Sequence, residues 1–311
     1  MSYQVNTINC QSDWANTGFG DCSIHMLIEG LIQVPKDASF TKEQLAAIVS
    51  HITTKTREAN PLNRFYPWPA FIGGEPTGGD PNKVDFDNGS SITTWENDYL
   101  FTGRFYEGGF PVNNALRTRN GQDLYFLAYG RGHLFGAVEN GVYKGFAGKN
   151  FWAASQMPGA FKVESKYSFS FNVTTRDWNE NLWYVKAPGI ETVKGLKTLE
   201  LEATASPVVS ATGLVKASLK LKGYGTDYVA LNGTAIIALS GWAAKNKATG
   251  EAITITTKTV VAGQLEFDLD HQDTHYPTSG GSIEITPPAI ADLAGAGTLN
   301  AEILPLTITV P

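Results

Sequence analysis

The last third of the chain alternates apolar and polar residues in short segments. Leu265, Phe267 and Leu269, for example, alternate with acidic residues. Successive strand residues point to opposite faces of a sheet, so this period of two predicts a strand with one buried face. Seven segments show the pattern, with turn-forming residues between them. The predicted strands are residues 198–203, 214–221, 234–239, 252–257, 264–269, 282–286 and 306–310.

One earlier segment carries the helical period instead. Leu45, Ile48 and Ile52 are spaced by three or four residues, which predicts an amphipathic helix. Thr41 and Gln44 match a capping box, in which each side chain bonds to the backbone N–H of the other residue. The proline at position 61 blocks continuation. We therefore expect one helix over residues 41–59.

The remaining pattern of the first two thirds favours strands. Residues 167–173 place Tyr167, Phe169 and Phe171 on one face, and residues 139–141 read as a tight hairpin turn. We expect a β-barrel or sandwich that carries the one helix. Its predicted strands are residues 124–129, 133–138, 141–146 and 167–173.

A long stretch of Gly, Pro, Asn and Asp lies between the helix and these strands, over residues 67–111. A structureless loop of this length is uncommon inside a compact domain, and disordered segments are poor in aromatic residues. We expect an arm whose aromatic residues are buried against a neighbouring chain, in preference to an internal lid. These aromatic residues are Trp68, Phe71, Trp95, Tyr99, Phe101, Phe105, Tyr106 and Phe110.

Composition divides the chain in two. Of its 7 Trp, 12 Tyr and 16 Phe, only five lie beyond residue 195, and every Arg lies before it. A Pro-Gly turn at 188–189 marks a short linker. We expect a mainly β protein with an assembly domain at 1–190 and an immunoglobulin-like β-sandwich at 191–311. The Cys, Trp, Cys signature of antibody domains is absent from this second part.

Charge and composition narrow the function classes. Hydrophobic residues make up 42% of the chain, which disfavours disorder, and the 32 Gly show no collagen period. The net charge of −6 gives no basic surface for gripping nucleic acid phosphates. The first ten residues lack the basic and apolar regions of a secretory signal, and no segment is long and apolar enough for a membrane span. We expect synthesis in the cytoplasm and no membrane partner.

One cluster has the composition of a metal site, because carboxylates and imidazoles are common metal ligands. It lacks the glycine and the distal Glu of a calcium loop. An exposed strand end and its loop explain the same residues, and we favour that interpretation. The cluster consists of Asp268, Asp270, His271, Asp273 and His275.

Other candidate chemistry is weaker still. The glycines of residues 130–136 are not followed by the Gly-Lys-Ser/Thr of a phosphate loop, so we expect a turn between strands. His25, His51 and His133 are dispersed without a nucleophile element. Cys10 and Cys22 match neither a redox motif nor a zinc site, and we interpret them as plain thiols. We predict no catalytic residue, no cofactor and no enzymatic activity.

Sugar binding is the alternative from another class. Trp95 with Glu96, and the acidic, aromatic residues 177–180, could contact glycans or supply carboxylates for glycan hydrolysis. The same residues serve equally well in a core or an interface. A carbohydrate-binding or glycan-degrading protein with an immunoglobulin-like accessory module therefore stays open.

The order of these parts resembles a bacteriophage tail tube protein. The residues that carry the resemblance are the hairpin-like segment 132–146, with the sequence Gly-His-Leu-Phe-Gly-Ala-Val-Glu-Asn-Gly-Val-Tyr-Lys-Gly-Phe, and the immunoglobulin-like end. Residues 1–40 have no counterpart in the resemblance. A head or neck protein of the virion with the same pair of modules is a second reading.

The resemblance implies subunits that form rings, commonly hexameric, stacked into a tube in the virion. The partners would be copies of the chain itself, other virion proteins, and DNA that passes through without sequence-specific binding. Acidic residues outnumber basic ones in both parts, 19 to 17 up to residue 195 and 11 to 7 beyond it. An acidic lumen would repel DNA phosphates and let the genome slide.

Overall fold

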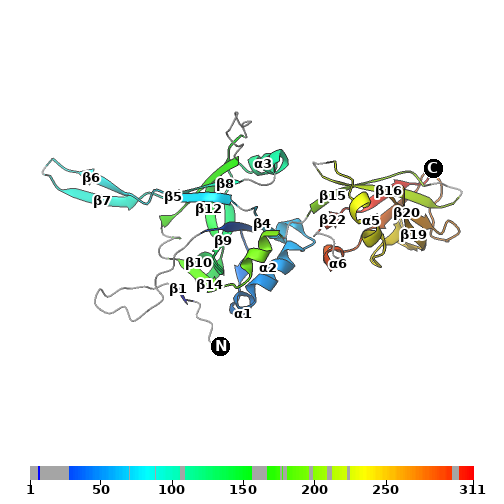
Figure 1. The fold of residues 1–311 in the computed structure, drawn as a ribbon, viewed down its shortest axis with the longest axis horizontal. Coiled ribbons are helices and arrows are strands. Elements are labelled where there is room, and N and C mark those ends of the chain that lie inside the picture. The colour runs from blue at the N-terminus through cyan, green and yellow to red at the C-terminus, as the bar shows by residue number, and fades with distance from the viewer. Residues whose placement is uncertain are drawn as a thin grey trace. The chain divides into compact units, whose positions relative to one another are not determined.

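A computed structural model gives the fold of the chain (Figure 1). It describes residues 6–7, 28–69, 71–87, 89–105, 109–155, 167–175, 177, 181–195, 199–208, 212–222, 225–295 and 301–311. Contacts divide the chain into two units, Met1–Leu196 and Lys197–Pro311. This division falls a few residues beyond the 190/191 boundary that composition indicated. Both units are mainly β, which confirms the predicted fold class.

The first unit is built on a 12-stranded sheet with the main strand order β1-β14-β10-β9-β12-β13-β8-β5, and β2, β3, β4 and β11 join it at the side. Its strands are β1 (Asn6–Thr7), β2 (Gly30–Val34), β3 (Ser39–Phe40), β4 (Tyr66–Pro67), β5 (Phe71–Thr77), β8 (Tyr99–Phe105), β9 (Leu124–Gly130), β10 (His133–Glu139), β11 (Val142–Lys144), β12 (Phe146–Ala153), β13 (Tyr167–Val173) and β14 (Leu182–Lys186). A separate two-stranded sheet contains β6 (Pro81–Asp85) and β7 (Ser91–Glu96). The helices given by the described residues include α1 (Lys42–Ala46), α2 (Ile48–Thr56) and α3 (Gly109–Arg117), with 3-10 turns η1 (Pro61–Asn63) and η2 (Ile190–Gly195).

Strand β9 is buried on both faces. Phe126 and Ala128 point into an aromatic core shared with β8, β12 and β13. Leu127 and Tyr129 point into a second core, which α1, α2 and η2 cover. A strand enclosed on both faces has no need of polar residues, which explains the continuous apolar run that predicted it.

The capping box of the predicted helix is confirmed. The Thr41 hydroxyl accepts from the N–H of Gln44 at 3.3 Å, and the Gln44 side chain accepts from the N–H of Thr41 at 2.9 Å. The helix predicted over 41–59 is present but interrupted, because Ala47 adopts φ −118° and ψ 38°, outside the helical region, and separates α1 from α2, which ends at Thr56. Periodicity misses this break because Leu45 and Ile48, on either side of it, belong to the same core.

The segment 67–111, which we expected to be an arm, has regular secondary structure of its own. The segment contains β5, β6, β7 and β8 and the beginning of α3. Strand β8 pairs with β13 along its whole length and with β5 on its other edge, so the segment makes backbone ladders of its own. Turn-forming residues are common here because three strand connections follow each other closely.

The four strands predicted in the first unit are all present, with shifted ends. The hairpin turn at 139–141 is confirmed between β10 and β11, where Asn140 and Gly141 have φ of 52° and 77°. Two successive positive φ values define the two-residue turn that matches strand twist. Strands β2 and β14, for which no prediction was made, flank β9 and β10.

The second unit is a two-sheet sandwich around its own core. One sheet has the order β19-β20-β16-β15-β22 and the other β18-β17-β21-β23. Its elements are β15 (Leu199–Ala205), β16 (Leu214–Leu221), α5 (Val229–Ile237), β17 (Ala243–Asn246), β18 (Ala252–Ile253), β19 (Ile255–Val261), β20 (Gln264–Leu269), β21 (Ser282–Thr286), α6 (Ile290–Gly295), β22 (Ala301–Ile303) and β23 (Leu306–Thr309).

This strand order is that of an immunoglobulin-like sandwich. Strands β15 to β21 correspond in chain order to the immunoglobulin strands A, B, C, C′, D, E and F. The first sheet then has the order D-E-B-A, followed by β22, and the second has the order C′-C-F, followed by β23. Trp242, directly before the C strand, is buried against Phe267 with ring centroids 4.9 Å apart. The expected sandwich is thus present without the antibody cysteines.

The predicted strand at 234–239 is instead part of the helix α5. Val229, Gly233 and Ile236 are buried at spacings of four and three residues, so the segment follows the helical period once its start is included. The Asp227 side chain accepts from the N–H groups of Val229 and Ala230 at 2.9 and 3.2 Å and stabilises the helix start. A short apolar run alone does not distinguish the two structures.

Candidate assembly interface

The hairpin of β6 and β7, residues 81–96, has a sheet of its own. Figure 1 shows it extending away from the rest of the first unit, beyond the ends of β5 and β8. Val84 pairs with Ile92 across the ladder. At the tip, the Phe86 N–H donates to the Ser90 carbonyl at 2.8 Å, and Gly89 adopts φ 80°. We call this element the β6–β7 hairpin.

One face of the β6–β7 hairpin is apolar and open to solvent. Val84, Phe86 and Ile92 are 46%, 45% and 55% exposed. Residues two apart on a strand, and directly opposed residues on paired strands, lie on one face. The three side chains therefore form a continuous patch, which we call the hairpin apolar face.

The root of the hairpin is held in place by close packing. Gly78 and Gly79 adopt φ of 103° and 76°, and a Cβ on Gly79 would lie 2.4 Å from the Tyr99 ring. The side-chain amide of Asn82 in β6 donates to the side-chain oxygen of Asn97, directly after β7, at 2.9 Å. The direction in which the hairpin leaves the sheet is therefore set by contacts within the chain.

For four of the eight aromatic residues expected to pack on a neighbouring chain, the expectation is wrong. Trp68, Phe71, Phe101 and Phe105 are buried in the core of their own unit. Tyr99 is half-buried at the hairpin root. For the others, the side chains of Trp95 in β7 and Phe110 in α3 lie outside the described residues, as does Tyr106.

The sequence analysis did not identify the exposed apolar residues of the β6–β7 hairpin, Val84, Phe86 and Ile92. An Asn-Gly pair flanked by alternating apolar residues is the strongest short-range hairpin signal. Asn88 and Gly89 form such a pair, between Val84 and Phe86 on one side and Ile92 on the other. The signal was hidden by the high glycine and proline content around it.

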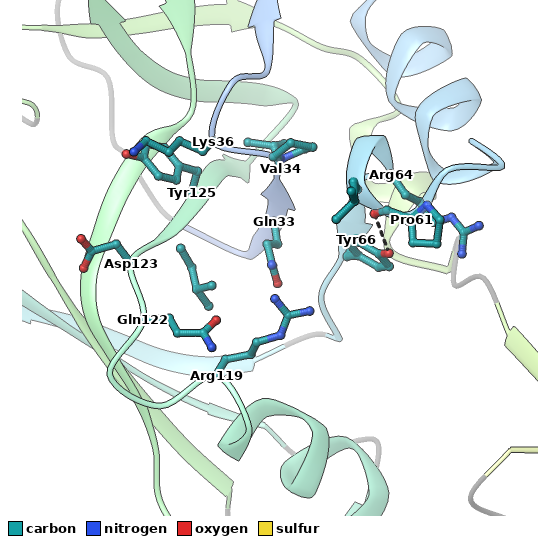
Figure 2. A pocket seen from close by; sticks show the side chains of 13 residues that line it. Gln33, Val34, Lys36, Pro61, Arg64, Tyr66, Arg119, Gln122, Asp123 and Tyr125 are labelled. Carbon is teal, nitrogen blue, oxygen red and sulfur yellow. Dashed lines mark hydrogen bonds between the residues drawn. The ribbon is translucent and has the colours of Figure 1, made fainter.

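A pocket of about 300 Å³ lies in the first unit between the end of β2, η1, β4 and the loop from α3 to β9 (Figure 2). Leu62, Tyr66 and Tyr125 supply apolar surface, and Lys36 and Arg119 supply positive charge. Leu62 is 81% exposed, so the pocket opens beside an uncovered leucine.

The residues of the metal candidate serve as turn caps. Asp270 accepts from the N–H of Gln272 at 3.0 Å, and Asp273 accepts from the N–H groups of His275 and Thr254 at 3.0 and 3.2 Å. The backbone N–H of His275 is the main cause that lowers the pKa of Asp273. Across the described residues, no group of three or more His, Cys, Asp or Glu is placed to hold a metal ion. Asp268 and His271 lie at the strand end and in the turn that we favoured from sequence.

The glycine-rich segment 130–136 is the turn between β9 and β10, as expected. Arg131 and Gly132 have φ of 48° and 71°, and their N–H groups donate to Glu29 and Glu191 at 3.3 and 3.0 Å. The two N–H groups that a bound phosphate would need are therefore bonded to carboxylates of the chain itself.

The two described histidines of the first unit, His51 and His133, have different neighbours. His51 packs in α2 against Phe40 and Phe65, with ring centroids 6.0 and 6.1 Å apart. His133 lies at the start of β10, with Nδ1 3.0 Å from the carbonyl oxygen of Arg131. His25, Cys10 and Cys22 lie outside the described residues.

None of the helices in the described part of the chain has the length and hydropathy that a membrane span needs. No protein-family model matches the chain, and no curated protein matches it either.

Proposed function

We propose that the chain is a non-enzymatic structural subunit of a bacteriophage virion that assembles with copies of itself into the stacked rings of a tail tube. In this proposal other virion proteins contact the tube, and DNA passes through it without sequence-specific binding. The segment 132–146, which carries the resemblance to this family, spans β10, β11 and the start of β12.

The observation that carries the proposal is the β6–β7 hairpin. An isolated two-stranded ribbon is marginally stable in water, and an exposed apolar face on it favours association. Val84, Phe86 and Ile92 do not belong to either of the two hydrophobic cores of the first unit. Burial of the hairpin apolar face on another copy supplies the missing contacts.

The first test is microscopy of the concentrated protein. We expect rings or tubes roughly 100 Å across, from several subunits of about 35 Å diameter arranged around a pore. Sedimentation velocity at increasing concentration measures the same association in solution. A protein that stays monomeric at the highest concentration contradicts the proposal.

The second test removes the hairpin apolar face. The triple variant V84S/F86S/I92S should remain folded by circular dichroism and lose assembly, because these side chains lie outside the cores. The matched control is L231S/L304S, which changes two leucines of the second unit that are 70% and 61% exposed. Equal assembly of both variants counts against a role for the hairpin.

A head or neck protein of the virion would share the module pair and self-association. Position in a particle separates it from a tail tube, so labelling of intact virions with an antibody against the second unit is the deciding measurement. Label along the tail supports the tube, and label confined to the head or neck overturns it.

Glycan binding is a second candidate function, favoured by Trp152. This tryptophan of β12 is 58% exposed and lies opposite Ser170 of β13. An exposed indole beside a hydroxyl group is the kind of surface on which sugar rings stack. Binding on a polysaccharide panel that is lost in Trp152→Ala supports this function, and the absence of binding excludes it for the glycans tested.

A further inference from the structure

The pocket beside η1 is positively charged at its mouth. Figure 2 shows the guanidinium of Arg119 and the amide of Gln33 pointing into the same space. Arg119 is exposed, and it makes no ion pair with any described residue. Lys36 is also exposed on the pocket rim. The lining contains one carboxylate, that of Asp123, which accepts from the N–H of Asn150 at 3.1 Å. Three basic side chains of the lining outnumber it, those of Lys36, Arg64 and Arg119.

The floor and wall of the pocket are suited to an aromatic side chain. Tyr66 and Tyr125 present rings, and Leu62 presents an uncovered aliphatic side chain. The Tyr66 hydroxyl donates to the Pro61 carbonyl at 3.0 Å, which fixes one wall. Aromatic side chains with a charged rim are typical of the buried centre and the edge of protein interfaces.

The tip of the β6–β7 hairpin has the complementary chemistry. Phe86 is exposed and lies between Asp85 and Asp87 in sequence. The whole hairpin with its root, residues 78–98, carries five carboxylates and one lysine. An aromatic side chain flanked by carboxylates matches an apolar pocket with Lys36 and Arg119 at its rim.

The tip and the pocket of one chain do not meet. Figure 1 shows the hairpin extending away from β4 and β9, the strands beside the pocket. Eight extended residues from the root to the tip span about 26 Å at the rise of a strand. Because the root packs closely at Gly79 against Tyr99, the hairpin directs its tip away from the pocket of its own chain.

We propose that the hairpin tip of one copy, with Phe86 and its flanking carboxylates, docks into the pocket beside η1 of a second copy. This inference rests on the proposed function, because it names the receptor for the assembly element. A tip and a pocket are different surfaces, so the contact is head-to-tail. Such a contact repeats from copy to copy and produces a closed ring or an open stack.

Charge reversal on each side tests the pairing. One variant, D85K/D87K, reverses the tip and keeps the natural pocket. The other, K36E/R119E, reverses the pocket and keeps the natural tip. Each alone should associate at least about tenfold more weakly than the natural protein, because like charges then face each other at every contact. Sedimentation velocity at low salt measures the association.

Mixing the two variants in equal amounts should restore assembly. In an alternating arrangement the lysine tip meets the glutamate pocket, and the natural tip meets the natural pocket, so every contact is again complementary. The matched control is Arg117→Glu, which removes an exposed arginine of the same helix region outside the pocket and should assemble normally. Thermal unfolding of each variant checks that the fold is intact.

Two results overturn the docking proposal while the proposed function stands. The first result is that K36E/R119E assembles normally although V84S/F86S/I92S does not assemble. The hairpin would then bind a surface other than this pocket. The other is a mixture of the two charge-reversed variants that assembles no better than either alone. Failure of the natural protein to assemble at all overturns both the docking and the proposed function.

Discussion

Trp68 and Phe86 are both aromatic residues of segment 67–111, yet their surroundings differ completely. The ring centroid of Trp68 lies 4.8 Å from that of Phe126 and 5.1 Å from that of Phe169, and both pairs have edge-to-face geometry. Phe86 lies at the hairpin tip and is half exposed. Residue type alone assigns both to the same class, and only the fold separates a core residue from a surface one.

Truncation of these two residues should have opposite consequences. Trp68→Ala should lower the free energy of unfolding of the first unit by about 3–5 kcal/mol, because it empties the centre of the aromatic core. Phe86→Ala should change it by less than about 0.5 kcal/mol and should weaken association instead. Urea unfolding and sedimentation velocity measure the two effects. A large loss of stability in Phe86→Ala would mean that the tip packs within its own chain.

The protonation of His51 should make the stability of the first unit depend on pH. Burial, and secondarily the charge of Lys55, lowers the pKa of His51 in the folded state from 6.5. The unfolded state then binds more protons between the two pKa values, so the free energy of unfolding falls as the pH drops below about 6.5. His51→Gln should flatten this dependence between about pH 7 and 5. His133→Gln is the control, because His133 does not pack against Phe40 and Phe65 as His51 does. An unchanged slope in His51→Gln would show that His51 does not cause the pH dependence.

At the scale of elements, the features predicted correctly from the sequence are those that depend on residues close together in the chain. The Thr41 capping box and the Asn140-Gly141 turn are local, and both are present. The break at Ala47 was missed because Leu45 and Ile48, on either side of it, keep the helical spacing of apolar residues. The helix α5 was missed because the window 234–239 left out its start at Val229. The strands of segment 67–111 were not predicted because their pairing is not local. Strand β8 pairs with β13, more than sixty residues later in the chain.

The residues that we propose for assembly lie in the segment that the sequence indicated, but they are not the aromatic residues that were named from it. The segment was identified as an assembly element because its aromatic residues needed burial, but the core of the same unit buries Trp68, Phe71, Phe101 and Phe105. The pocket could not be predicted at all. Its walls come from β2, η1 and the loop before β9, and no motif links Lys36, Leu62 and Arg119 along the chain.

The hairpin root offers a test at this scale. Gly79→Ala should loosen the hairpin, because its φ of 76° disfavours a side chain and the new Cβ would lie 2.4 Å from the Tyr99 ring. Amide hydrogen exchange should speed up over residues 81–96 while the sheet strands keep their protection. Gly89→Ala is a partial control, since φ there is also positive but no atom lies within 4 Å of the new Cβ. Unchanged exchange in Gly79→Ala would show that the root does not hold the hairpin.

At the scale of the whole molecule, each unit has its own hydrophobic core. The core of the second unit extends from Leu201 to Val310, and among the described residues it takes no member from the first unit. Its two sheets are closed by pairing within the unit, including the parallel pair of β15 and β22. A core and a complete set of ladders are what an independently folding domain requires.

Residues 197–311 should therefore fold when expressed alone. Trp242, the single tryptophan of this part, is buried against Phe267, and its indole N–H donates to the Ile236 carbonyl at 2.9 Å. Its fluorescence should be that of an indole shielded from water and should shift to longer wavelength in one cooperative urea transition. Phe267→Ala should lower the free energy of unfolding by about 3–5 kcal/mol, because a fully buried ring is removed beside the probe. Leu304→Ser, at an exposed position, should leave the transition in place. A solvent-exposed emission spectrum in the natural fragment, or a transition without cooperativity, would show that the sandwich needs the first unit to fold.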